Sequence, residues 1–325
     1  MLKKIVHPDI FHGENKKRNF FEGWYFKLVD KERKNAYALI PGIFLGERKD
    51  YSHSFIQILH GKESLYLYKK YNIEDFKWHR DKFVINIKDN IFSLSGIKVD
   101  IKDSAISLNG KVIFNNIIKW PDTIMNPGSM GFYNYIPFMQ CYSQVSSLNM
   151  DLNGYLEVNG EVIDFNGGKG YVEKNWGKAF PYSWVWVQCN NFKNKTVSVT
   201  CSIGEVPFLL SKFRGFLIGL TLNNKFYKFT TMNRSKLNIS KKGEDICIKV
   251  NNGTNTLIID IESPKDKFIL CNGPRDNKMI PLVKENLNSK VKIQLKCNID
   301  NKILYYDEGV CGGVEYGGKI INILE

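Results

Sequence analysis

Apolar residues recur at every second position over much of this chain. Within residues 82–114 (KFVINIKDNIFSLSGIKVDIKDSAISLNGKVIF), Phe83, Ile85 and Ile87 occupy alternate positions. Three dipeptides that are typical of turns interrupt the pattern: Asp89-Asn90, Lys102-Asp103 and Asn109-Gly110. Because successive side chains of a strand point to opposite faces, this pattern predicts a meander of short antiparallel strands with a turn about every 8–12 residues.

The second half of the chain repeats this pattern as a series of hairpins. The three clearest span residues 215–232, 245–263 and 290–309, with predicted turns at Asn223-Asn224, Asn251-Asn252-Gly253 and Asp300-Asn301. No long stretch has the 3.6-residue period of a helix. The segment 280–289 (IPLVKENLNS) predicts one short helix at most.

Many short antiparallel strands are typical of β-sandwiches and β-barrels, so the predicted fold class is all-β. Two β-rich halves predict two β domains, although no clear sequence repeat relates them. The Gly-rich segment DFNGGKG (164–170) marks the boundary. We therefore predict an N-terminal domain over residues 1–165 and a C-terminal domain over residues 166–325.

The segment 120–141 (WPDTIMNPGSMGFYNYIPFMQC) breaks the strand pattern. It holds three Pro, two Gly and many large apolar side chains. A long loop of this kind in a compact domain is usually functional. Two interpretations are equally open: a lid over the core of its own domain, and a lid over a ligand.

The charge of the chain favours some partners over others. The 325 residues carry a formal net charge of +13, and only seven of the 46 basic residues are Arg. Arg, rather than Lys, forms the planar fork that suits phosphates and nucleic-acid bases. Since the lysines are also spread along the chain, we interpret them as a solvated basic surface and predict no nucleic-acid partner. A weak attraction to anionic membrane surfaces stays open.

Cysteine usage and the N-terminus indicate a compartment. The seven Cys include no C-x-x-C pair, and several, such as Cys201 and Cys247, occupy apolar positions of predicted strands. Buried free thiols are typical of a reducing compartment. The start of the chain has no apolar leader, and no run approaches the roughly 20 apolar residues of a membrane helix. The sequence predicts a soluble, cytoplasmic protein, with peripheral membrane contact left open and no indication of oligomeric state.

The common motifs of enzyme chemistry do not occur in this sequence. There is no phosphate-binding G-x-x-x-x-G-K-[ST] loop, no G-x-G-x-x-G in a strand-to-helix setting and no G-x-S-x-G elbow. The five His all lie within the first 79 residues and lack the spacing of metal ligands. We therefore predict that the protein uses no metal and no cofactor.

Two acids lie within dense aromatic runs: Glu22 in NFFEGWYFKLVD and Glu173 in GYVEKNWGKAFPYSWVWVQCNNF. A carboxyl surrounded by aromatic rings keeps its proton to higher pH, because its charged form loses hydration. Such a group can act as a Brønsted acid near neutrality. The alternative is an ordinary role, in which each acid lies at the surface, bonds to backbone N–H groups, or forms a salt bridge to Lys27 or Lys174.

Three segments of the chain resemble the tocopherol cyclase family: RNFFEGWYFKL (18–28), GYVEKNWGKAFPYSWVWVQCNNF (170–192) and GVEYGG (313–318). Their order and spacing fit that family, and the likeness covers nearly the whole chain. A more distant resemblance is to carotenoid 1,2-hydratases, which carry an aromatic–x–acid–x–x–Trp–Gly segment. That resemblance implies two lipocalin-like antiparallel β-barrel or sandwich domains packed together, with an apolar cleft between them.

The resemblance also implies a reaction. Tocopherol cyclases protonate an alkene of a prenyl tail, and a neighbouring phenol oxygen captures the cation. The hydratases protonate a similar alkene, and water captures the cation. Both steps need an acid in a dry pocket and aromatic faces that stabilise the cation. The expected activity is thus proton-initiated cyclisation of a prenylated quinol-type or isoprenoid substrate, by an intramolecular lyase or isomerase. Two alternatives stay open: an alkene hydratase, and a non-catalytic binding protein for a lipid, quinone or isoprenoid.

The resemblance makes Glu173 the candidate proton donor, with Glu22 as the second candidate carboxyl. Where the hydratases have Asp, this chain has Glu173, and where they have His and a further acid it has Lys174 and Asn175. A lysine beside the carboxyl would favour its ionised form. Seven residues are candidate walls of the substrate pocket: Trp24, Tyr25, Tyr171, Trp176, Trp184, Trp186 and Gln188.

The last three candidates share one face if their segment is a strand. Trp184, Trp186 and Gln188 would then point away from the alternate residues 185, 187 and 189, and one of the two faces would line the barrel interior. An equally open interpretation makes the tryptophans part of a domain-interface core.

Overall fold

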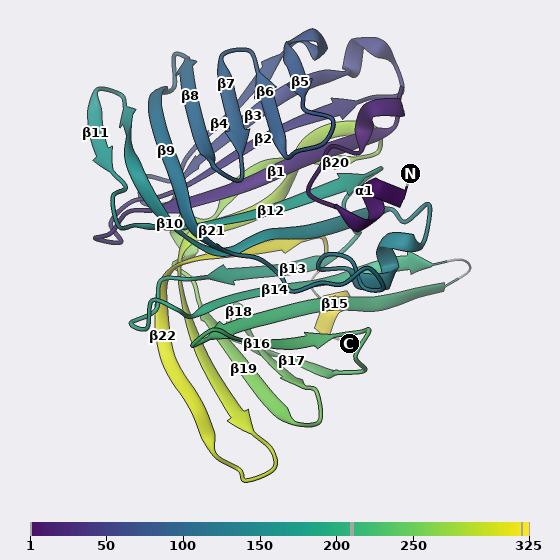
Figure 1. The fold of residues 1–325 in the computed structure, drawn as a ribbon, viewed down its shortest axis with the longest axis vertical. Helices are drawn as coiled ribbons and strands as arrows, with labels where there is room; N and C mark the ends of the chain where they lie inside the picture. The colour runs from purple at the N-terminus through teal and green to yellow at the C-terminus, as the bar shows by residue number, and fades with distance from the viewer. Residues whose placement is uncertain (1, 209–210, 320, 325) are drawn as a thin grey trace. The chain divides into compact units, whose positions relative to one another are not determined.

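The protein consists almost entirely of antiparallel β-strands, which confirms the predicted all-β class (Figure 1). The computed structural model describes residues 2–208, 211–319 and 321–324. The chain divides into two compact units, each with its own sheet and core. The first unit comprises Met1–Phe180 and Cys271–Pro281, and the second comprises Pro181–Leu270 and Leu282–Glu325.

Twelve of the described strands form the first sheet, in the order β4-β3-β2-β1-β12-β10-β9-β8-β7-β6-β5 with β11 beside β10. These strands are β1 (Phe20–Val29), β2 (Ala36–Leu45), β3 (His53–His60), β4 (Leu65–Tyr71), β5 (Phe76–Trp78), β6 (Val84–Ile87), β7 (Asn90–Ser93), β8 (Gly96–Lys102), β9 (Ser107–Ile118), β10 (Cys141–Val158), β11 (Glu161–Asp164) and β12 (Lys169–Gly177). Short helical segments accompany them: α1 (Leu2–Val6), η1 (Gly13–Asn15), η2 (Lys49–Tyr51), η3 (Ile73–Asp75) and η4 (Gly131–Tyr135).

The first unit extends further along the sequence than the Gly-rich segment suggested. We predicted a boundary between residues 165 and 166. In the structure, β12 follows that segment and pairs with both β1 and β10. The first unit therefore continues to Phe180, and the later segment Cys271–Pro281 also belongs to it.

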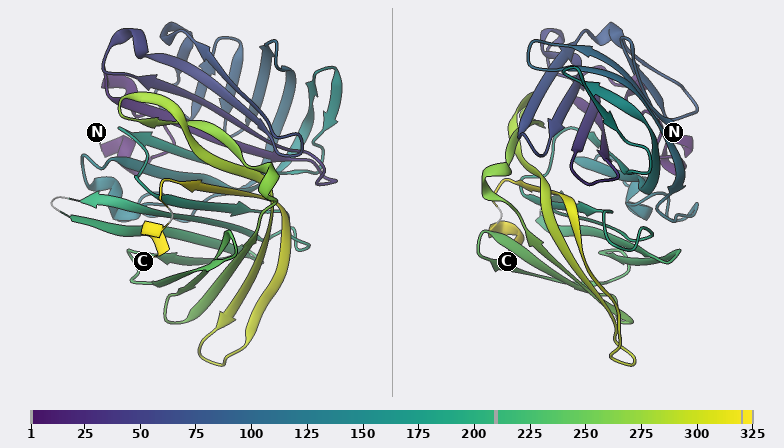
Figure 2. Two further views of the ribbon diagram at one scale, coloured as in Figure 1. Left: turned by 180° about the vertical axis from the view of Figure 1, so that it is seen from behind. Right: turned by 90° about the vertical axis from the view of Figure 1, so that its left-hand side faces the viewer.

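The core of the first unit lies on one face of its sheet, which curls around it (Figure 2). Ile56 of β3 and Phe92 of β7 belong to one cluster of buried side chains, although β3 and β7 lie far apart in the strand order. Phe11, from the segment before β1, packs into the same cluster. Its ring centroid lies 5.1 Å from that of Phe76. The N-terminal segment is thus part of this core.

The meander predicted for residues 82–114 is confirmed as β6–β9. In β8, Ile97, Val99 and Ile101 are buried, and the residues between them are not. The dipeptide Asn109-Gly110 is not a turn, however, because it lies inside β9. There it pairs without interruption with residues 156–157 of β10, so the backbone of both strands stays extended.

The second sheet has the order β16-β15-β14-β13-β22-β21-β19-β18-β17, with β20 paired to β21. Its strands are β13 (Trp184–Cys189), β14 (Ser198–Phe208), β15 (Ser211–Leu222), β16 (Lys225–Thr230), β17 (Lys236–Lys242), β18 (Asp245–Asn251), β19 (Asn255–Glu262), β20 (Ile269–Arg275), β21 (Lys278–Cys297) and β22 (Ile303–Gly317). Two short helical segments complete the order: η5 (Lys265–Lys267) and α2 (Ile321–Leu324).

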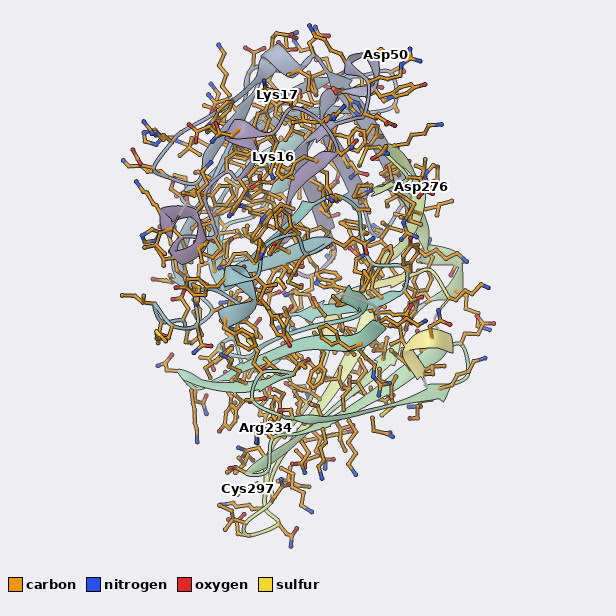
Figure 3. All side chains as sticks on the ribbon, turned by 90° about the vertical axis from the view of Figure 1, so that its right-hand side faces the viewer. Lys16, Lys17, Asp50, Arg234, Asp276 and Cys297 are labelled. Carbon is orange, nitrogen blue, oxygen red and sulfur yellow. The ribbon has the colours of Figure 1, made fainter. Side chains whose placement is uncertain are left out.

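The three predicted hairpins are confirmed as β15–β16, β18–β19 and β21–β22. Asn223 and Asn224 have φ angles of 50° and 62°. A two-residue hairpin turn needs such left-handed values, which Asn tolerates. The short helix predicted for residues 280–289 is wrong, because these residues belong to β21. Cys297 ends that strand at the tip of the β21–β22 hairpin (Figure 3).

Candidate functional site on strand β12

Strand β12 lies between β1 and β10 and carries different chemistry on its two faces (Figure 1). Neighbouring residues of a strand point to opposite faces. Trp176 belongs to the core of the first unit, and Lys174 shares its face. Tyr171, Glu173 and Asn175 share the opposite face, which we call the polar face.

The Glu173 carboxyl lies on the polar face with only 4% of the residue exposed. The Tyr171 hydroxyl donates a hydrogen bond to its Oε2 atom at 2.6 Å. The Ser143 hydroxyl of β10 and the Asn175 amide donate to its Oε1 atom at 3.3 and 3.2 Å. Burial favours the neutral acid, whereas three donors stabilise the carboxylate. A carboxyl in this setting is suited both to release a proton and to take it back.

Tyr25 and Cys141 flank Glu173 on the polar face. Tyr25 of β1 is the direct partner of Glu173 in the register, and it is buried. Burial raises the pKa of the Cys141 thiol, and the Glu173 charge adds to this effect, so the thiol stays protonated. Gly23, opposite Asn175, leaves a place without a side chain beside the acid. A Cβ atom there would meet nothing closer than 3.8 Å.

The pairing of β10 with β12 is irregular next to Glu173. Val145 is the partner of Glu173, but the register shifts between Val145 and Ser147. Such bulges re-aim side chains and are common beside active sites. The extra residue, Ser146, donates its hydroxyl to Asp9 at 2.5 Å. The bulge thus connects the N-terminal segment to the strand that holds Ser143.

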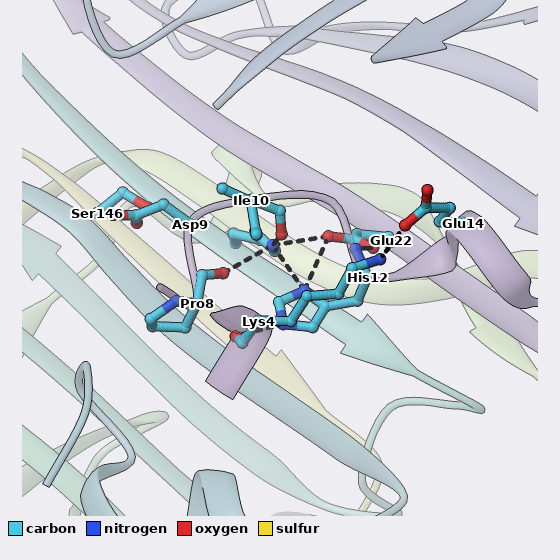
Figure 4. A network of polar contacts seen from close by, with 9 residues as sticks. Lys4, Pro8, Asp9, Ile10, His12, Glu14, Glu22 and Ser146 are labelled. Carbon is cyan, nitrogen blue, oxygen red and sulfur yellow. Dashed lines mark hydrogen bonds and ion pairs between the residues drawn. The ribbon is translucent and has the colours of Figure 1, made fainter. Parts of the chain in front are cut away.

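On the core face, Lys174 forms a fully buried ion pair with Glu22. Figure 4 shows Glu22 beside His12 and near the backbone of Pro8 and Ile10. Its Nζ atom lies 2.7 Å from Glu22 Oε1. It also donates to the carbonyl oxygens of Pro8 and Ile10 at 2.7 and 2.5 Å. The other carboxylate oxygen of Glu22 accepts the backbone N–H of His12 at 2.8 Å. The pair therefore fastens residues 8–12 to β1 and β12.

His12 completes this cluster and takes part in a stack of rings. Its ring lies 4.1 Å from that of Trp176 with an interplanar angle of 10°, and Tyr142 stacks on Trp176 at 5.3 Å. His12 Nδ1 lies 3.0 Å from Lys174 Nζ, and Nε2 lies 3.2 Å from the Lys4 carbonyl oxygen. Because a carbonyl oxygen can only accept, Nε2 donates to Lys4, and the proton of a neutral ring is on Nε2.

The charges of the core-face cluster follow from burial and pairing. Burial by itself would raise the pKa of Glu22, but the Lys174 charge and the contacts with His12 outweigh it and lower that pKa. Burial lowers the pKa of Lys174, and the Glu22 charge opposes this. Burial, and then the Lys174 charge, lower the pKa of His12. Glu22 is accordingly a carboxylate rather than a stored acid at neutral pH.

Our expectation that Lys174 would favour ionisation of its neighbour Glu173 is wrong. The two residues are adjacent on one strand, so their side chains point to opposite faces of the sheet. Lys174 instead pairs with Glu22, which is 152 residues away in the sequence. The neighbour in sequence is therefore not the ion-pair partner in space.

Acidification is expected to destabilise the fold in two steps through this cluster. His12 and Glu22 have folded-state pKa values below their ordinary values of 6.5 and 4.5. Their contributions are fully present above those values and are lost as the pH falls below them, because the unfolded chain binds protons first. Urea unfolding between pH 7.5 and 4, at about half-unit steps, measures this slope.

The variant His12→Asn should lose part of the first step. Burial also lowers the pKa of His53 and of His60, so these residues contribute to the same pH range in both proteins. The difference between native and variant curves therefore isolates His12. An unchanged slope between pH 7 and 5.5 in the variant would contradict the assignment.

The structure divides the sequence-predicted site residues into three places. Tyr25, Tyr171 and Glu173 lie together on the polar face. Trp24 and Trp176 lie in the core of the first unit with Glu22. The remaining three lie on β13 of the second unit, and all are buried: Trp184, Trp186 and Gln188.

On β13, the face that lines the core of the second unit is opposite to Trp184, Trp186 and Gln188. Val185, Val187 and Cys189 belong to the core of the second unit. Trp184 points the other way, and its indole N–H donates to Glu315 Oε2 at 3.1 Å. Glu315 is the direct register partner of Glu285 across β21 and β22, so two carboxyls lie side by side on this face.

Sequence reasoning missed several members of these groups. Ser143 and Asn175 contact Glu173, and alternation along the strand could have indicated Asn175, because it lies two residues further on. No local signal indicated Ser143 or His12, which approach β12 only through the fold. Glu285 and Glu315 were likewise not selected, although GVEYGG was recognised as a family segment.

The described residues contain no group of three or more His, Cys, Asp or Glu side chains that could hold a metal ion. Among the helices in the described part of the chain, none has the length and apolar character needed to cross a membrane.

A family model described as tocopherol cyclase-like matches residues 107–318. The chain belongs to the tocopherol cyclase-like family. The resemblance seen in the sequence is thereby confirmed. The matched range of this tocopherol cyclase-like protein includes Glu173 and its three hydrogen-bond donors. Glu22 and His12 lie before it.

Two plant proteins match a shorter part of the chain. A protein named as a probable chloroplastic tocopherol cyclase from Oryza sativa subsp. japonica is 33% identical over 115 residues, which is 34% of this chain and 24% of that protein. The chloroplastic tocopherol cyclase of Zea mays is 32% identical over 103 residues, which is 30% of this chain and 22% of that protein. The matched segments thus span about a quarter of the length of these relatives.

Solved structures share the fold at low sequence identity. CghA in its crystal structure with Sch210972 matches with a TM-score of 0.59 and 8% identity, over 92% of this chain and 88% of that chain. A protein assigned as AttH from Nitrosomonas europaea matches with a TM-score of 0.52 and 11% identity, over 92% of both chains. At these identities the likeness concerns the fold alone.

Proposed function

We propose that the protein catalyses proton-initiated cyclisation of a prenylated quinol-type or isoprenoid substrate, with Glu173 as the proton donor. The observation that carries this proposal is the buried Glu173 carboxyl, held by Tyr171, Ser143 and Asn175 within the family-matched part of the chain. Membership of the tocopherol cyclase-like family supports the reaction type.

The proposed reaction is an isomerisation, and its protons balance within one turnover. Glu173 transfers its proton to one alkene carbon of the prenyl tail, which leaves a tertiary cation on the other carbon. The phenol oxygen forms a C–O bond to that cation. The phenol proton then passes to the Glu173 carboxylate, which restores the acid. Tyr171 and Asn175 stabilise the carboxylate between these steps, and the ring of Tyr25 offers a π face beside it.

Glu22 has a different role in this proposal. Its carboxylate is committed to Lys174 and to the His12 backbone, on the face of the sheet opposite to Glu173. A carboxylate with a lowered pKa has no proton to give at neutral pH. We therefore assign Glu22 to the stability of the first unit.

The test uses purified full-length protein and a prenylated hydroquinone in detergent micelles, analysed by chromatography and mass spectrometry. Cyclisation yields a product of unchanged mass that has lost one phenolic hydroxyl and, in D2O, carries one new C–D bond. A product heavier by one water would identify a hydratase instead. Saturable quenching of tryptophan fluorescence without any product would overturn the catalytic proposal in favour of a binding protein for a hydrophobic ligand.

A further inference from the structure

The segment between β9 and β10, residues 120–140, exposes several large apolar side chains, and we call it the apolar loop. Ile124, Met125 and Phe138 are 76%, 77% and 88% exposed. Two further aromatic side chains of the loop are 44% and 37% exposed. Apolar surface in water is unfavourable, and so many large exposed apolar side chains within one loop indicate an interaction surface.

Polar bonds fix the backbone of the apolar loop. The Ser129 backbone N–H donates to Gln144 Oε1 at 2.9 Å, and its hydroxyl donates to the Ser143 carbonyl oxygen at 3.1 Å. Inside the loop, the Asn134 amide donates to the Pro127 carbonyl oxygen at 2.7 Å. These bonds tie the base of the loop to β10 and fix its backbone, while Ile124, Met125 and Phe138 stay exposed.

Phe138 has a strained backbone in addition to its exposure. Its φ angle is 66°, in the left-handed region that bulky residues rarely adopt. Asn or Gly at this position would relieve the strain. Because the Phe138 ring is 88% exposed, its packing contributes little to the stability of the fold. Strained positions of this kind cluster at functional sites. The ring is thus placed for a contact outside the chain.

The charges around the apolar loop indicate the kind of partner. Its one acid, Asp122, accepts the Gly128 backbone N–H at 2.8 Å. Exposed Lys119 and Lys178 lie at its two ends, where the Lys178 N–H donates to the Gln140 carbonyl oxygen at 2.9 Å. The whole chain has a net charge of +13. Apolar and aromatic side chains bordered by lysine are typical of segments that insert into the interface of an anionic bilayer.

We propose that the apolar loop docks the protein on the surface of an anionic phospholipid bilayer, with Ile124, Met125 and Phe138 inserted into the interfacial region. Protein interfaces concentrate their binding energy in Trp, Tyr and Arg. The three most exposed large apolar side chains here are of other types, and the loop contains no Arg. A bilayer, which needs apolar insertion and general positive charge, fits this composition better than a protein partner.

The base of the apolar loop lies beside the candidate acid. The Ser129 hydroxyl donates to the Ser143 carbonyl oxygen and accepts the Val145 N–H at 3.1 Å. The Ser143 hydroxyl in turn contacts Glu173. If the proposed function holds, docking would bring Glu173 near the layer in which prenyl lipids dissolve. Bilayer binding itself is measured without substrate and does not depend on the proposed function.

A basic hollow of about 1030 Å³ in the first unit is the competing surface for an anionic bilayer. Lys16 and Lys17, which line this hollow, are labelled in Figure 3. Its lining includes seven basic and three acidic side chains but few apolar ones: Lys16, Lys17, Arg18, Lys49, Lys69, Lys70 and Lys88, with Glu47, Glu74 and Asp75. A concave, polar surface can attract anions but offers few apolar side chains that could insert into a bilayer. Binding through it would disappear at high salt.

The experiment is flotation of the full chain with vesicles of phosphatidylcholine, with and without phosphatidylserine, at low and high salt. The loop variant is Ile124→Ser/Met125→Ser/Phe138→Ser. The matched control alters three exposed side chains at the tip of the β21–β22 hairpin: Ile299→Ser/Ile303→Ser/Tyr306→Ser. Thermal unfolding of each variant establishes that it is folded.

The native protein is expected to bind vesicles that contain phosphatidylserine, and part of this binding should persist at high salt. The loop variant should bind at least about tenfold more weakly, and the hairpin variant like the native protein. In Phe138→Trp, brominated lipid should quench the added tryptophan. The proposal is overturned if the folded loop variant binds like the native protein, if the hairpin variant alone loses binding, or if the native protein binds no vesicles. Glu173→Gln should bind vesicles normally, so this proposal and the proposed function fail separately.

Discussion

Glu173→Gln is expected to lower turnover by about 10²-fold or more and to leave the protein folded. The amide has nearly the same shape as the acid but cannot transfer a proton to an alkene. Its carbonyl oxygen can still accept from Tyr171 at the position now occupied by Oε2, so the local hydrogen bonding is largely kept. The measurement compares turnover, affinity for the prenylated hydroquinone and melting temperature on a single preparation.

The matched control is Glu157→Gln, which makes the same substitution at an exposed position of β10 in the same sheet. It should leave turnover and melting temperature unchanged. Full activity in a well-folded Glu173→Gln protein would rule out Glu173 as the donor. A large fall in melting temperature with normal turnover per folded molecule would instead make Glu173 a structural residue.

Glu22→Gln is expected to have the opposite signature, a loss of stability of about 3–5 kcal/mol. The substitution leaves Lys174 fully buried with its charge no longer compensated. It also weakens the attachment of residues 8–12, because the same carboxylate accepts the His12 N–H. Urea unfolding followed by tryptophan fluorescence should report the change, since Trp24 and Trp176 lie within 5.4 and 4.7 Å of the Lys174 ammonium.

Two further variants test whether the uncompensated charge is the cause. Glu22→Gln/Lys174→Met removes both charges and should recover part of the lost stability, because an apolar side chain tolerates burial. Glu244→Gln breaks an exposed ion pair with Lys265 and should cause no measurable change. If the Glu22→Gln variant unfolds at the same urea concentration as the native protein, the ion pair does not stabilise the fold. The assignment of Glu22 to stability then fails.

Much of the architecture could be read from local sequence. The meander of β6–β9 and the three hairpins follow from alternation and from turn residues such as Asn223 and Asn224, because both signals act between near neighbours. The secondary-structure predictions were wrong where pairing with a strand distant in the sequence determines the conformation. Residues 280–289 carry an ambiguous pattern, and pairing with β22 extends them as part of β21. Asn109-Gly110 resembles a turn, but pairing with β10 keeps it extended.

The candidate site shows the same division. The aromatic–acid segments selected Glu173 and Glu22, and the family match covers the first of them. The side to which each carboxyl points depends on strand register, so the sequence did not reveal that they lie on opposite faces of the sheet. Lys174 and His12 reach Glu22 only because β1 pairs with β12 and because the N-terminal segment folds over both strands.

By itself, then, the sequence determined the all-β class, most of the hairpins and the family, since period-two alternation, turn chemistry and long aromatic motifs are properties of contiguous residues. Only the tertiary structure decided which acid is paired and which is held by neutral donors such as Tyr171 and Ser143. It also decided that Ile124, Met125 and Phe138 are exposed to solvent, whereas Trp120 and Met139 of the same segment are buried. The Glu22–Lys174 pair joins residues 152 positions apart, and no local pattern encodes the distance between them.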